Sequence, residues 1–436
     1  MRRIAILAGL VVHATAAAAQ SGDAEVARAT ERLTPHLVEV RHDLHQHPEL
    51  SNRETRTGTF VAGELRRLGL EVRTGVARTG VIGVLKGARP GPTVAVRADM
   101  DALPVVEQGD LPWRSTVTTT YAGRDVGVSH VCGHDMHVAV ALGVAEVLAG
   151  MRERLAGTVV FVFQPAEEGA PAGEEGGARL MIKEGVLREY RPDIMLTLHT
   201  NGAPPEQAGD FERAGLVSYS PGAAYSASTT WRARIVGRSS HGASPHLGVD
   251  AIVAASQAVL ALQTIRSRNV DPQAFTVLTV GVLRAGERHN IVAGAATLEG
   301  TIRTFSDSLS GYVRRRMEEI LRGTTEAAGA GYELEFPDAN PVTMNDPALV
   351  ARFAPVLQRA LGRANVAEAP PITASEDFAW FAREVPSFYF QLGVVGAGHV
   401  SGGHHTPTFR ADDEAIPVGV RAMSALVLDY LRGKGK

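Results

Sequence analysis

The sequence predicts an α/β protein with a central, mostly parallel sheet in its larger domain and a smaller α+β domain inserted into that domain. Several segments are nearly continuously apolar, which is typical of strands buried on both faces of a parallel sheet. Helical patterns alternate with these strands. The middle of the chain follows a different order of elements, and 436 residues suffice for two domains without disulfide support.

Four apolar strands are followed directly by reactive side chains. They lie at 93–97 in "PTVAVRADMDALP", 158–163 in "GTVVFVFQPAEEG", 193–199 in "DIMLTLHTNG" and 387–394 in "SFYFQLGV". Ligands of open α/β sheets bind beyond the carboxyl ends of the strands. We therefore expect the side chains that follow these strands to share one site. Helices are predicted over 55–69 and 138–154 from their apolar spacing.

The middle of the chain predicts a ferredoxin-like unit. Its order is strand, helix, strand, strand, helix, strand, in which the helices cover 250–266 and 308–328. The predicted organisation is a signal peptide, a first part of the larger α/β domain, the inserted smaller domain, and a second part of the larger domain, at 1–19, 20–222, 223–337 and 338–436.

The N-terminus "MRRIAILAGLVVHATAAAAQ" has a basic start, a short apolar stretch and a small-residue end, as in secretory signal peptides. We expect cleavage after Ala19 and export to the periplasm or medium. The apolar stretch is too short to span a bilayer, so no stable membrane anchor is expected. The alternative is a short, uncleaved, membrane-associated helix. A net charge of −3 without a basic run argues against a nucleic-acid partner.

The segment "HVCGHDMH" contains the single cysteine of the chain, Cys132, two residues before His134. An exported protein with one cysteine forms no internal disulfide, and metal ligation is one way to protect its thiol. Simple burial is the alternative. Thiolate and imidazole together suit zinc better than manganese or cobalt.

The segment "QPAEEG" places Glu167 and Glu168 after a buried strand. Adjacent side chains of extended backbone point in opposite directions, so the two carboxylates are not expected to bind the same ion. We expect one to bind metal and the other to handle the proton of a water. The alternative is an ordinary solvated pair of glutamates.

The ordered motifs resemble those of a known family. They are "RHDLHQHPELSNRE", "RADMDALP", "HVCGHDMH", "QPAEEG", "LHTN", "GRSSHGASPHLGVDAI", "GTIRTF", "ASEDFA" and "HHTPTF". The resemblance is to the aminoacylase and glutamate carboxypeptidase family of dinuclear metallohydrolases, in particular its amidohydrolase subgroup of hippurate hydrolases, N-acyl-amino-acid amidohydrolases and auxin-conjugate hydrolases. It covers nearly all of residues 33–430, although the loop "APAGEEGGA" is long for the pattern.

The resemblance implies two divalent metal ions per subunit, zinc or manganese, with cobalt and nickel as alternatives. The implied ligands are Cys132, His134, Glu168, His199 and His405. His405 is preferred to His404 because it directly precedes the Thr-Pro that matches the family motif. Glu167 is implied as the general base, which removes a proton from the attacking water and returns it to the leaving nitrogen.

Further roles follow from the resemblance. Asp101 and Asp135 would orient ligand imidazoles, with helix capping as the alternative. His241 would reach the site of a neighbouring subunit and stabilise the oxyanion, which implies a homodimer through the inserted domain. Asn290 and Arg303 would bind the substrate carboxylate, with a surface hydrogen bond as the alternative.

The predicted activity is hydrolysis of the amide bond of a small-molecule N-acyl amino acid, either hippurate-like or N-acetylated. A dipeptidase or carboxypeptidase of the same family is one alternative. A non-catalytic periplasmic binding protein on the same fold is another, and the presence of Glu167 with all five implied ligands argues against it.

Overall fold

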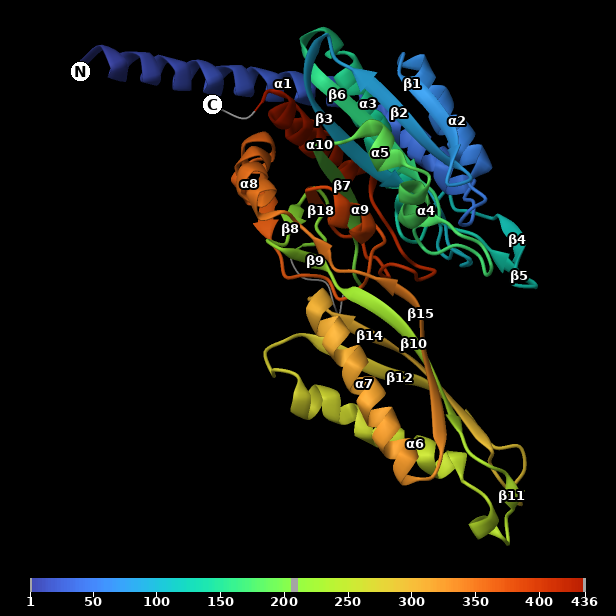
Figure 1. Cartoon of the computed structure of the whole chain (residues 1–436). Helices are drawn as coiled ribbons and strands as arrows, with labels where there is room; N and C mark the ends of the chain where they lie inside the picture. Colours follow the sequence, from blue (N-terminus) through green and yellow to red (C-terminus); the bar gives the residue numbers. More distant parts are fainter. Residues whose placement is uncertain (1, 205–210, 434–436) are drawn as a thin grey trace. The chain divides into compact units, whose positions relative to one another are not determined.

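The computed structural model describes residues 2–204 and 211–433, with side chains from Gly22 onward. The chain forms two units. The first unit contains Met1–Gly222, Asn345–Pro370 and Phe381–Lys436, and the second contains Ala223–Met344 and Pro371–Trp380. Figure 1 labels their helices and strands.

The first unit is built on an eight-stranded mixed sheet. In spatial order its strands are β1 (Glu71–Val76), β2 (Gly80–Lys86), β6 (Ala156–Gln164), β3 (Arg89–Asp99), β7 (Ile194–Asn201), β18 (Ser387–Gly393), β8 (Val217–Tyr219) and β17 (Val366–Glu368). The four adjacent strands β6, β3, β7 and β18 are parallel to one another, and they are the four strands that the sequence predicts. The predicted α/β class with a mostly parallel centre is confirmed.

Antiparallel strands complete the sheet on both sides of this parallel centre. β2 pairs antiparallel with both β1 and β6, and β8 pairs antiparallel with β18. A short hairpin, β4 (Thr118–Tyr121) with β5 (Arg124–Gly127), forms a separate two-stranded sheet.

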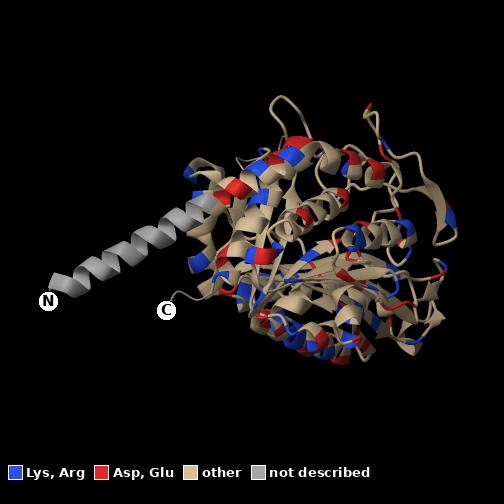
Figure 2. Cartoon of the chain, turned by 90° about the horizontal axis from the view of Figure 1, so that it is seen from above, with Lys and Arg blue, Asp and Glu red and all other residues tan. Residues whose placement is uncertain are grey.

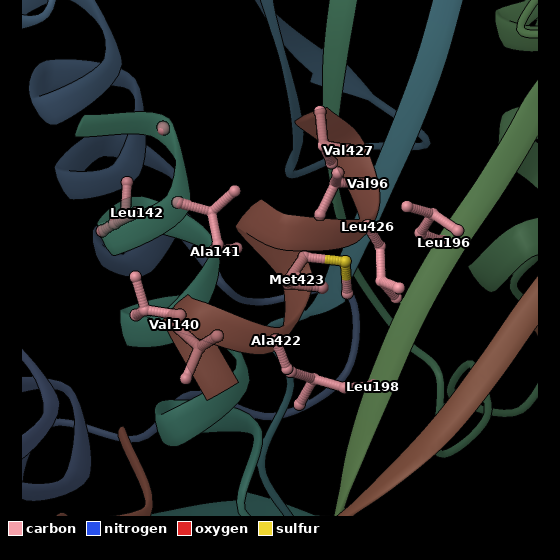
Figure 3. Packing of buried hydrophobic residues seen from close by; sticks show 14 of the residues in the cluster. Val96, Val140, Ala141, Leu142, Leu196, Leu198, Ala422, Met423, Leu426 and Val427 are labelled. Carbon is pink, nitrogen blue, oxygen red and sulfur yellow. The ribbon is translucent and has the colours of Figure 1, made fainter. Parts of the chain in front are cut away.

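The helices outside the inserted fold cover this sheet. They are α1 (Arg2–Gln46), α2 (Thr55–Arg67), α3 (His134–Ala149), α4 (Gly177–Lys183), α5 (Val186–Tyr190), α8 (Pro347–Leu361), α9 (Ala379–Glu384) and α10 (Ile416–Leu431). Helices α3 and α10 pack on β3 and β7, and α1 packs on both helices. Figure 3 shows side chains of α3 and α10, such as Val140 and Met423, in one buried cluster with Val96 of β3 and Leu196 of β7. Burial of these apolar side chains is the main favourable term that fixes the sheet against its helices.

Helix α3 differs from its predicted range of 138–154 at both ends. It begins at His134, because Gly133 adopts a left-handed backbone conformation (φ 84°) that turns the chain into the helix. It ends at Ala149, and Arg152–Arg154 form a separate 3₁₀ turn. The earlier start places His134 in the first helical turn rather than in a loop.

The second unit has the expected order of elements. A four-stranded antiparallel sheet runs in the spatial order β12 (Thr276–Ala285), β14 (Ala295–Thr304), β10 (Ala227–Val236), β15 (Gly331–Asn340). Helices α6 (Ala251–Thr264) and α7 (Asp307–Ala327) share one apolar core with it. This is the strand order of a ferredoxin-like fold. The remaining short pairs are β9 (Ala223–Tyr225) with β16 (Thr343–Met344), and β11 (Ser240–His241) with β13 (Ile291–Val292).

A distant segment also belongs to the second unit, beyond the predicted range 223–337. Residues 371–380 join it through backbone and side-chain hydrogen bonds. The hydroxyl of Ser226 donates to the carbonyl of Thr373 (2.8 Å), and the indole of Trp380 donates to Asn340 (2.9 Å). Such pairing is not visible in local sequence patterns.

The predicted signal peptide, 1–19, lies outside the residues whose side chains the structure describes. Among the described residues, none of the helices combines the length and hydropathy needed to cross a bilayer. Basic and acidic residues both occur on the outer helices in Figure 2, in keeping with the nearly balanced charge of the chain.

Candidate metal centre

The parallel centre of the large sheet gathers the predicted ligands at the carboxyl ends of its strands. β3 ends at Asp99, β6 at Gln164, and β7 contains His199 two residues before its end. The loop after β18 carries His404 and His405. Parallel neighbours place these ends on one edge of the sheet, so segments far apart in sequence meet there.

Three of the predicted ligands form a compact buried group. Candidate ligand atoms of Cys132, His134 and His199 all lie within 4.8 Å of one another. The sulfur of Cys132 is 3.5 Å from Nε2 of His199. Sulfur and imidazole nitrogen are the donors that zinc prefers. The group therefore has the donor chemistry of a metal site.

Hydrogen bonds orient both imidazoles of this group. Nδ1 of His134 donates to the backbone carbonyl of Asp101 (2.8 Å), and Nδ1 of His199 donates to the carbonyl of Thr200 (2.7 Å). With the proton on Nδ1, Nε2 of each ring keeps its lone pair for a cation. The backbone thus selects the tautomer that a metal ligand needs.

Glu167 and Glu168 lie in a turn rather than in extended backbone, so the expectation that they point in opposite directions is wrong. Ala166 before them has a positive φ of 52°, and this bend redirects the chain after β6. Carboxylate oxygens of both glutamates and a nitrogen of His134 lie within 4.8 Å of one another. Both carboxylates consequently reach the same centre.

The loop after β18 brings a third imidazole to the centre. Nε2 of His405 is 2.9 Å from Oε1 of Glu168, and these two residues group with Cys132 within 4.8 Å. The backbone of His405 has a φ of 62°, and its N–H donates to the carbonyl of Val131 (2.8 Å). Left-handed backbone at a non-glycine residue is strained, and such strain concentrates at functional sites. His404 instead lies beside His199, with ring centroids 5.3 Å apart.

The two predicted orienting carboxylates occupy different surroundings. Asp101 supports the centre, because its Oδ2 accepts hydrogen bonds from the hydroxyl of Ser51 (2.8 Å) and the backbone N–H of Glu168 (3.0 Å). Asp135 lies in a separate buried network, in which its Oδ2 accepts from Arg41 (3.0 Å) and from His45 (3.0 Å). Neither Arg41 nor His45 is a predicted ligand.

Sequence reasoning missed a buried pair, Asp99 and His137. Nδ1 of His137 lies 2.5 Å from Oδ1 of Asp99, and its Nε2 accepts the backbone N–H of Thr200 (2.8 Å). Asp99 and His137 also group with His134 within 4.8 Å. The available signal was spacing, because His137 follows His134 by three residues and therefore shares its helical face.

Thr200 connects the segments that carry the ligands. Its backbone N–H donates to His137, its carbonyl accepts from His199, and its hydroxyl donates to the carbonyl of Cys132 (2.9 Å). The same hydroxyl lies 3.4 Å from Nε2 of His404. A Cβ at Gly133 would lie only 2.5 Å from this hydroxyl, so the close approach of the two segments requires glycine there.

The electrostatics of the centre favour a bound cation. Burial alone would lower the pKa of His134, but Asp99 and Asp101 outweigh it and raise the pKa to about 10. Burial and the adjacent Glu168 raise the pKa of the Cys132 thiol well above its usual range, so its thiolate needs a counter-charge. Nε2 of His134 is buried and has no hydrogen-bond partner among the described residues. The donor set and this unused nitrogen fit divalent metal.

The predicted substrate-binding residues belong to the second unit. His241 is exposed on β11 and its Nδ1 accepts the backbone N–H of Ala243 (3.1 Å). Asn290, also exposed, accepts the backbone N–H of Gly242 with its carbonyl (2.8 Å), so it lies beside the His241 turn. Arg303 lies on β14, where Nη1 is buried without a hydrogen-bond partner among the described residues.

The fold and the donor set define a hydrolase of the dinuclear metal-binding class. Residues 95–429 match the peptidase family M20/M25/M40. The chain belongs to this family, which confirms the resemblance seen in its motifs and establishes it as an enzyme of the hydrolase class.

Curated relatives share nearly the whole chain. N-acetyl-L-cysteine deacetylase of Bacillus subtilis is 34% identical, and the match covers 88% of this chain and 85% of the relative. Thermostable carboxypeptidase 2 of Saccharolobus solfataricus is 33% identical over 90% of this chain and 95% of the relative. Among solved structures, the Bacillus subtilis YXEP protein, described as a dinuclear metal binding peptidase from the M20 family, superposes with a TM-score of 0.76. It is 29% identical and the match covers 93% and 99% of the two chains.

Proposed function

We propose that this enzyme hydrolyses the amide bond that joins an acyl group to an amino acid. The observation that carries the proposal is the meeting of a thiol, three imidazoles and two carboxylates at one edge of the large sheet. Of the two carboxylates, only Glu168 is a proposed ligand. The other, Glu167, is available as the base that a hydrolase requires.

The proposed ligands are Cys132, His134, Glu168, His199 and His405. Two divalent ions bound there would supply Lewis acidity and lower the pKa of a water molecule. The thiolate favours zinc, with manganese, cobalt and nickel as alternatives.

Glu167 is the proposed general base. Its carboxylate is half-buried and lies within 4.8 Å of the ligand atoms of His134 and Glu168. In hydrolysis it would take the proton of the attacking water and deliver it to the leaving nitrogen. Delivery matters because an amide nitrogen leaves poorly as an anion.

The class of substrate is supported by a relative whose name states deacetylation of an N-acetyl amino acid. A relative named carboxypeptidase keeps a second candidate open, namely cleavage of a peptide bond. The two candidates differ in whether the group next to the cleaved bond is a neutral acyl chain or a residue with a free amino group.

The second unit supplies the proposed contacts to the rest of the substrate. His241 would stabilise the oxyanion in the site of a partner subunit, which makes the active form a homodimer. Arg303 and Asn290 would bind the substrate carboxylate. The unpartnered Nη1 of Arg303 supports this role, because a guanidinium binds a carboxylate with two parallel hydrogen bonds.

Export is also part of the proposal, with removal of residues 1–19 by a signal peptidase. The chain is joined to the rest of the first unit only a few residues after that segment. Asp23 accepts a hydrogen bond from Arg359 (2.7 Å), and Glu25 accepts one from Arg154 (2.8 Å). Determination of the N-terminal residue of protein recovered from outside the cytoplasm tests it. A retained Met1 would contradict cleavage.

A substrate screen tests the proposed activity. Protein loaded separately with zinc, manganese, cobalt or nickel is assayed with N-acetyl and N-benzoyl amino acids and with the matching dipeptides, at equal metal occupancy. The proposal predicts faster hydrolysis of the N-acyl compounds. Preference for dipeptides would favour the peptidase alternative, and no turnover with metal retained would favour a binding protein.

A further inference from the structure

A cavity of about 600 Å³ lies within the first unit. It is lined by residues of the segment 48–53, by the β4 region at 117–122, by Val128, and by residues 171–172 of the loop that follows the two glutamates. Cavities of roughly 300–1,000 Å³ are typical of sites that bind small molecules. The size is therefore sufficient for an organic group much larger than acetyl.

The walls of this cavity are mainly apolar. They include Leu50, Val117 and Val128, which pack together with Ala102. Pro171 and Ala172 form part of the opposite wall. Such a lining binds apolar groups by removing their surface from water.

The charged side chains of the cavity already have partners. The carboxylate of Glu49 accepts the backbone N–H groups of Arg56 (3.0 Å) and Thr57 (2.8 Å). The guanidinium of Arg53 donates to both carboxylate oxygens of Glu174 (3.1 and 2.6 Å). A ligand group with its own charge would have to compete with these pairs. The cavity consequently suits an uncharged group.

Two structural links join the cavity to the catalytic carboxylates. The wall residue Ser51 donates to Asp101, whose same oxygen accepts the backbone N–H of Glu168. The wall residues 171–172 follow Glu168 in the same loop, so they lie only a few residues along the chain from the proposed base and ligand. Asp101 therefore links the cavity wall at Ser51 to the backbone of the proposed ligand Glu168.

We propose that this cavity is the subsite for the acyl group of the substrate, and that it selects apolar acyl groups larger than acetyl. The inference rests on the proposed N-acyl amino acid hydrolysis. Of the two ends of such a substrate, the acyl end is uncharged, whereas the amino-acid end carries a carboxylate. Among the described residues that line the cavity, Arg53 is the only cation, and it is engaged by Glu174, so none of them offers the amino-acid end a free cationic partner.

Filling the cavity tests the proposal. Ala172 is exposed on the cavity wall, and Ala172→Trp would occupy the space that the acyl group needs. Ala88→Trp is the matched control, because Ala88 is also exposed in the first unit and does not line the cavity. Metal-loaded wild type and both variants are assayed with N-acetyl-, N-octanoyl- and N-benzoyl-methionine.

The expected result is a wild-type kcat/KM at least tenfold higher for the octanoyl or benzoyl compound than for the acetyl compound. Ala172→Trp should reduce that ratio about tenfold, with kcat/KM for the acetyl compound changed less than threefold, and Ala88→Trp should leave the ratio unchanged. An unchanged ratio in Ala172→Trp, or equal losses for all substrates, would overturn the assignment. If Ala172→Trp does not fold, Thr119→Trp on the opposite wall serves the same purpose.

Failure of the subsite and failure of the proposed activity give different results. Hydrolysis of N-acyl amino acids with no effect of either cavity variant on acyl preference rejects the subsite alone. If wild type hydrolyses none of the three compounds, the proposed activity fails, and calorimetric titration with octanamide, which carries no charge, then tests the cavity directly. Binding weakened tenfold by Ala172→Trp supports the cavity, and equal or absent binding in both proteins rejects it.

Discussion

The metal centre of the first unit and the substrate-binding residues of the second unit are constructed differently. In the first unit, His134 and His199 are buried, and a backbone carbonyl fixes the tautomer of each ring. In the second unit, His241 is exposed at the end of a short two-stranded pair, and Asn290 is exposed directly before the second strand of that pair. Metal binding is therefore preorganised within the chain, whereas the proposed contacts to the substrate lie on exposed side chains, which have fewer neighbours to hold them in place.

The largest expected effect is on kcat, and it separates the role of Glu167 as the proposed base from that of Glu168 as a proposed metal ligand. Glu167→Ala should lower kcat by about 10³-fold, since general-base catalysis contributes about 10²–10⁴-fold. Its metal content should remain that of wild type, because Glu167 is not a proposed ligand. Elemental analysis and steady-state kinetics measure both quantities, and Glu168→Ala, which should lose metal, is the comparison. Turnover within tenfold of wild type would contradict the assignment of the base.

A second prediction tests the exposed region. His241→Ala should lower kcat by about 10²-fold, the cost of losing one donor to a developing oxyanion. Metal content should not change. His246→Ala, at another exposed histidine five residues further on, is the matched control and should retain full activity. Equal activities of the two variants would contradict the proposed role of His241 in stabilising the oxyanion.

A third prediction tests whether Thr200, which connects the segments that carry the ligands, preorganises the metal centre. In Thr200→Val, the valine side chain has nearly the same shape as threonine but lacks the hydroxyl that donates to the carbonyl of Cys132. We expect about a tenfold loss of metal affinity, as for other residues that hold ligands in place. Titration with cobalt, followed by the thiolate-to-cobalt absorption band, measures affinity without turnover.

Thr200→Ser is the control for that experiment, because it retains the hydroxyl. It should restore affinity to within about threefold of wild type, and the substrate KM of both variants should stay unchanged. If valine and serine variants bind cobalt equally well, the hydroxyl does not position the ligand segment.

A fourth prediction concerns stability rather than activity or metal binding, through His45. Burial by itself lowers the pKa of His45, but Asp135 and Glu107 outweigh burial and raise it to about 9. Both ring nitrogens lie 3.0 Å from a carboxylate oxygen, as expected for the charged form. The folded pKa exceeds the unfolded value near 6.5, so the contribution is complete below about pH 6.5 and is lost as pH rises through about 9.

The shift corresponds to a contribution on the order of 3 kcal/mol to the free energy of unfolding. Denaturant unfolding of wild type at pH 6.5 and 9.5, at constant metal loading, should show part of this loss. His45→Gln should be less stable at pH 6.5 and should show a flatter pH dependence. Parallel pH profiles for the two proteins would mean that His45 does not carry a charge in the folded state.

The sequence predicts the parallel centre of the sheet well, because the apolar runs at 94–96 in β3 and 194–196 in β7 are buried at every residue, as expected for strands covered on both faces. Long-range pairing and turns were harder to predict. The pairing of residues 371–380 with the second unit depends on hydrogen bonds between segments far apart in the sequence. The direction of Glu167 and Glu168 depends on a backbone bend, the positive φ at Ala166.

Supporting residues were missed for a related reason. His137 and Thr200 lie inside the motifs "HVCGHDMH" and "LHTN", but their role comes from hydrogen bonds between segments that are more than sixty residues apart. Sequence motifs indicate which atoms can bind metal. They do not indicate which neighbours hold those atoms in place.

Anomalous X-ray diffraction from crystals of the metal-loaded protein tests the central claim most directly. We predict two peaks roughly 3.5–4 Å apart, the spacing of two-metal sites, within bonding distance of Cys132, His134, Glu168, His199 and His405. Peaks elsewhere on the molecule, or no ordered peak between the thiol of Cys132 and the imidazole of His405, would contradict it.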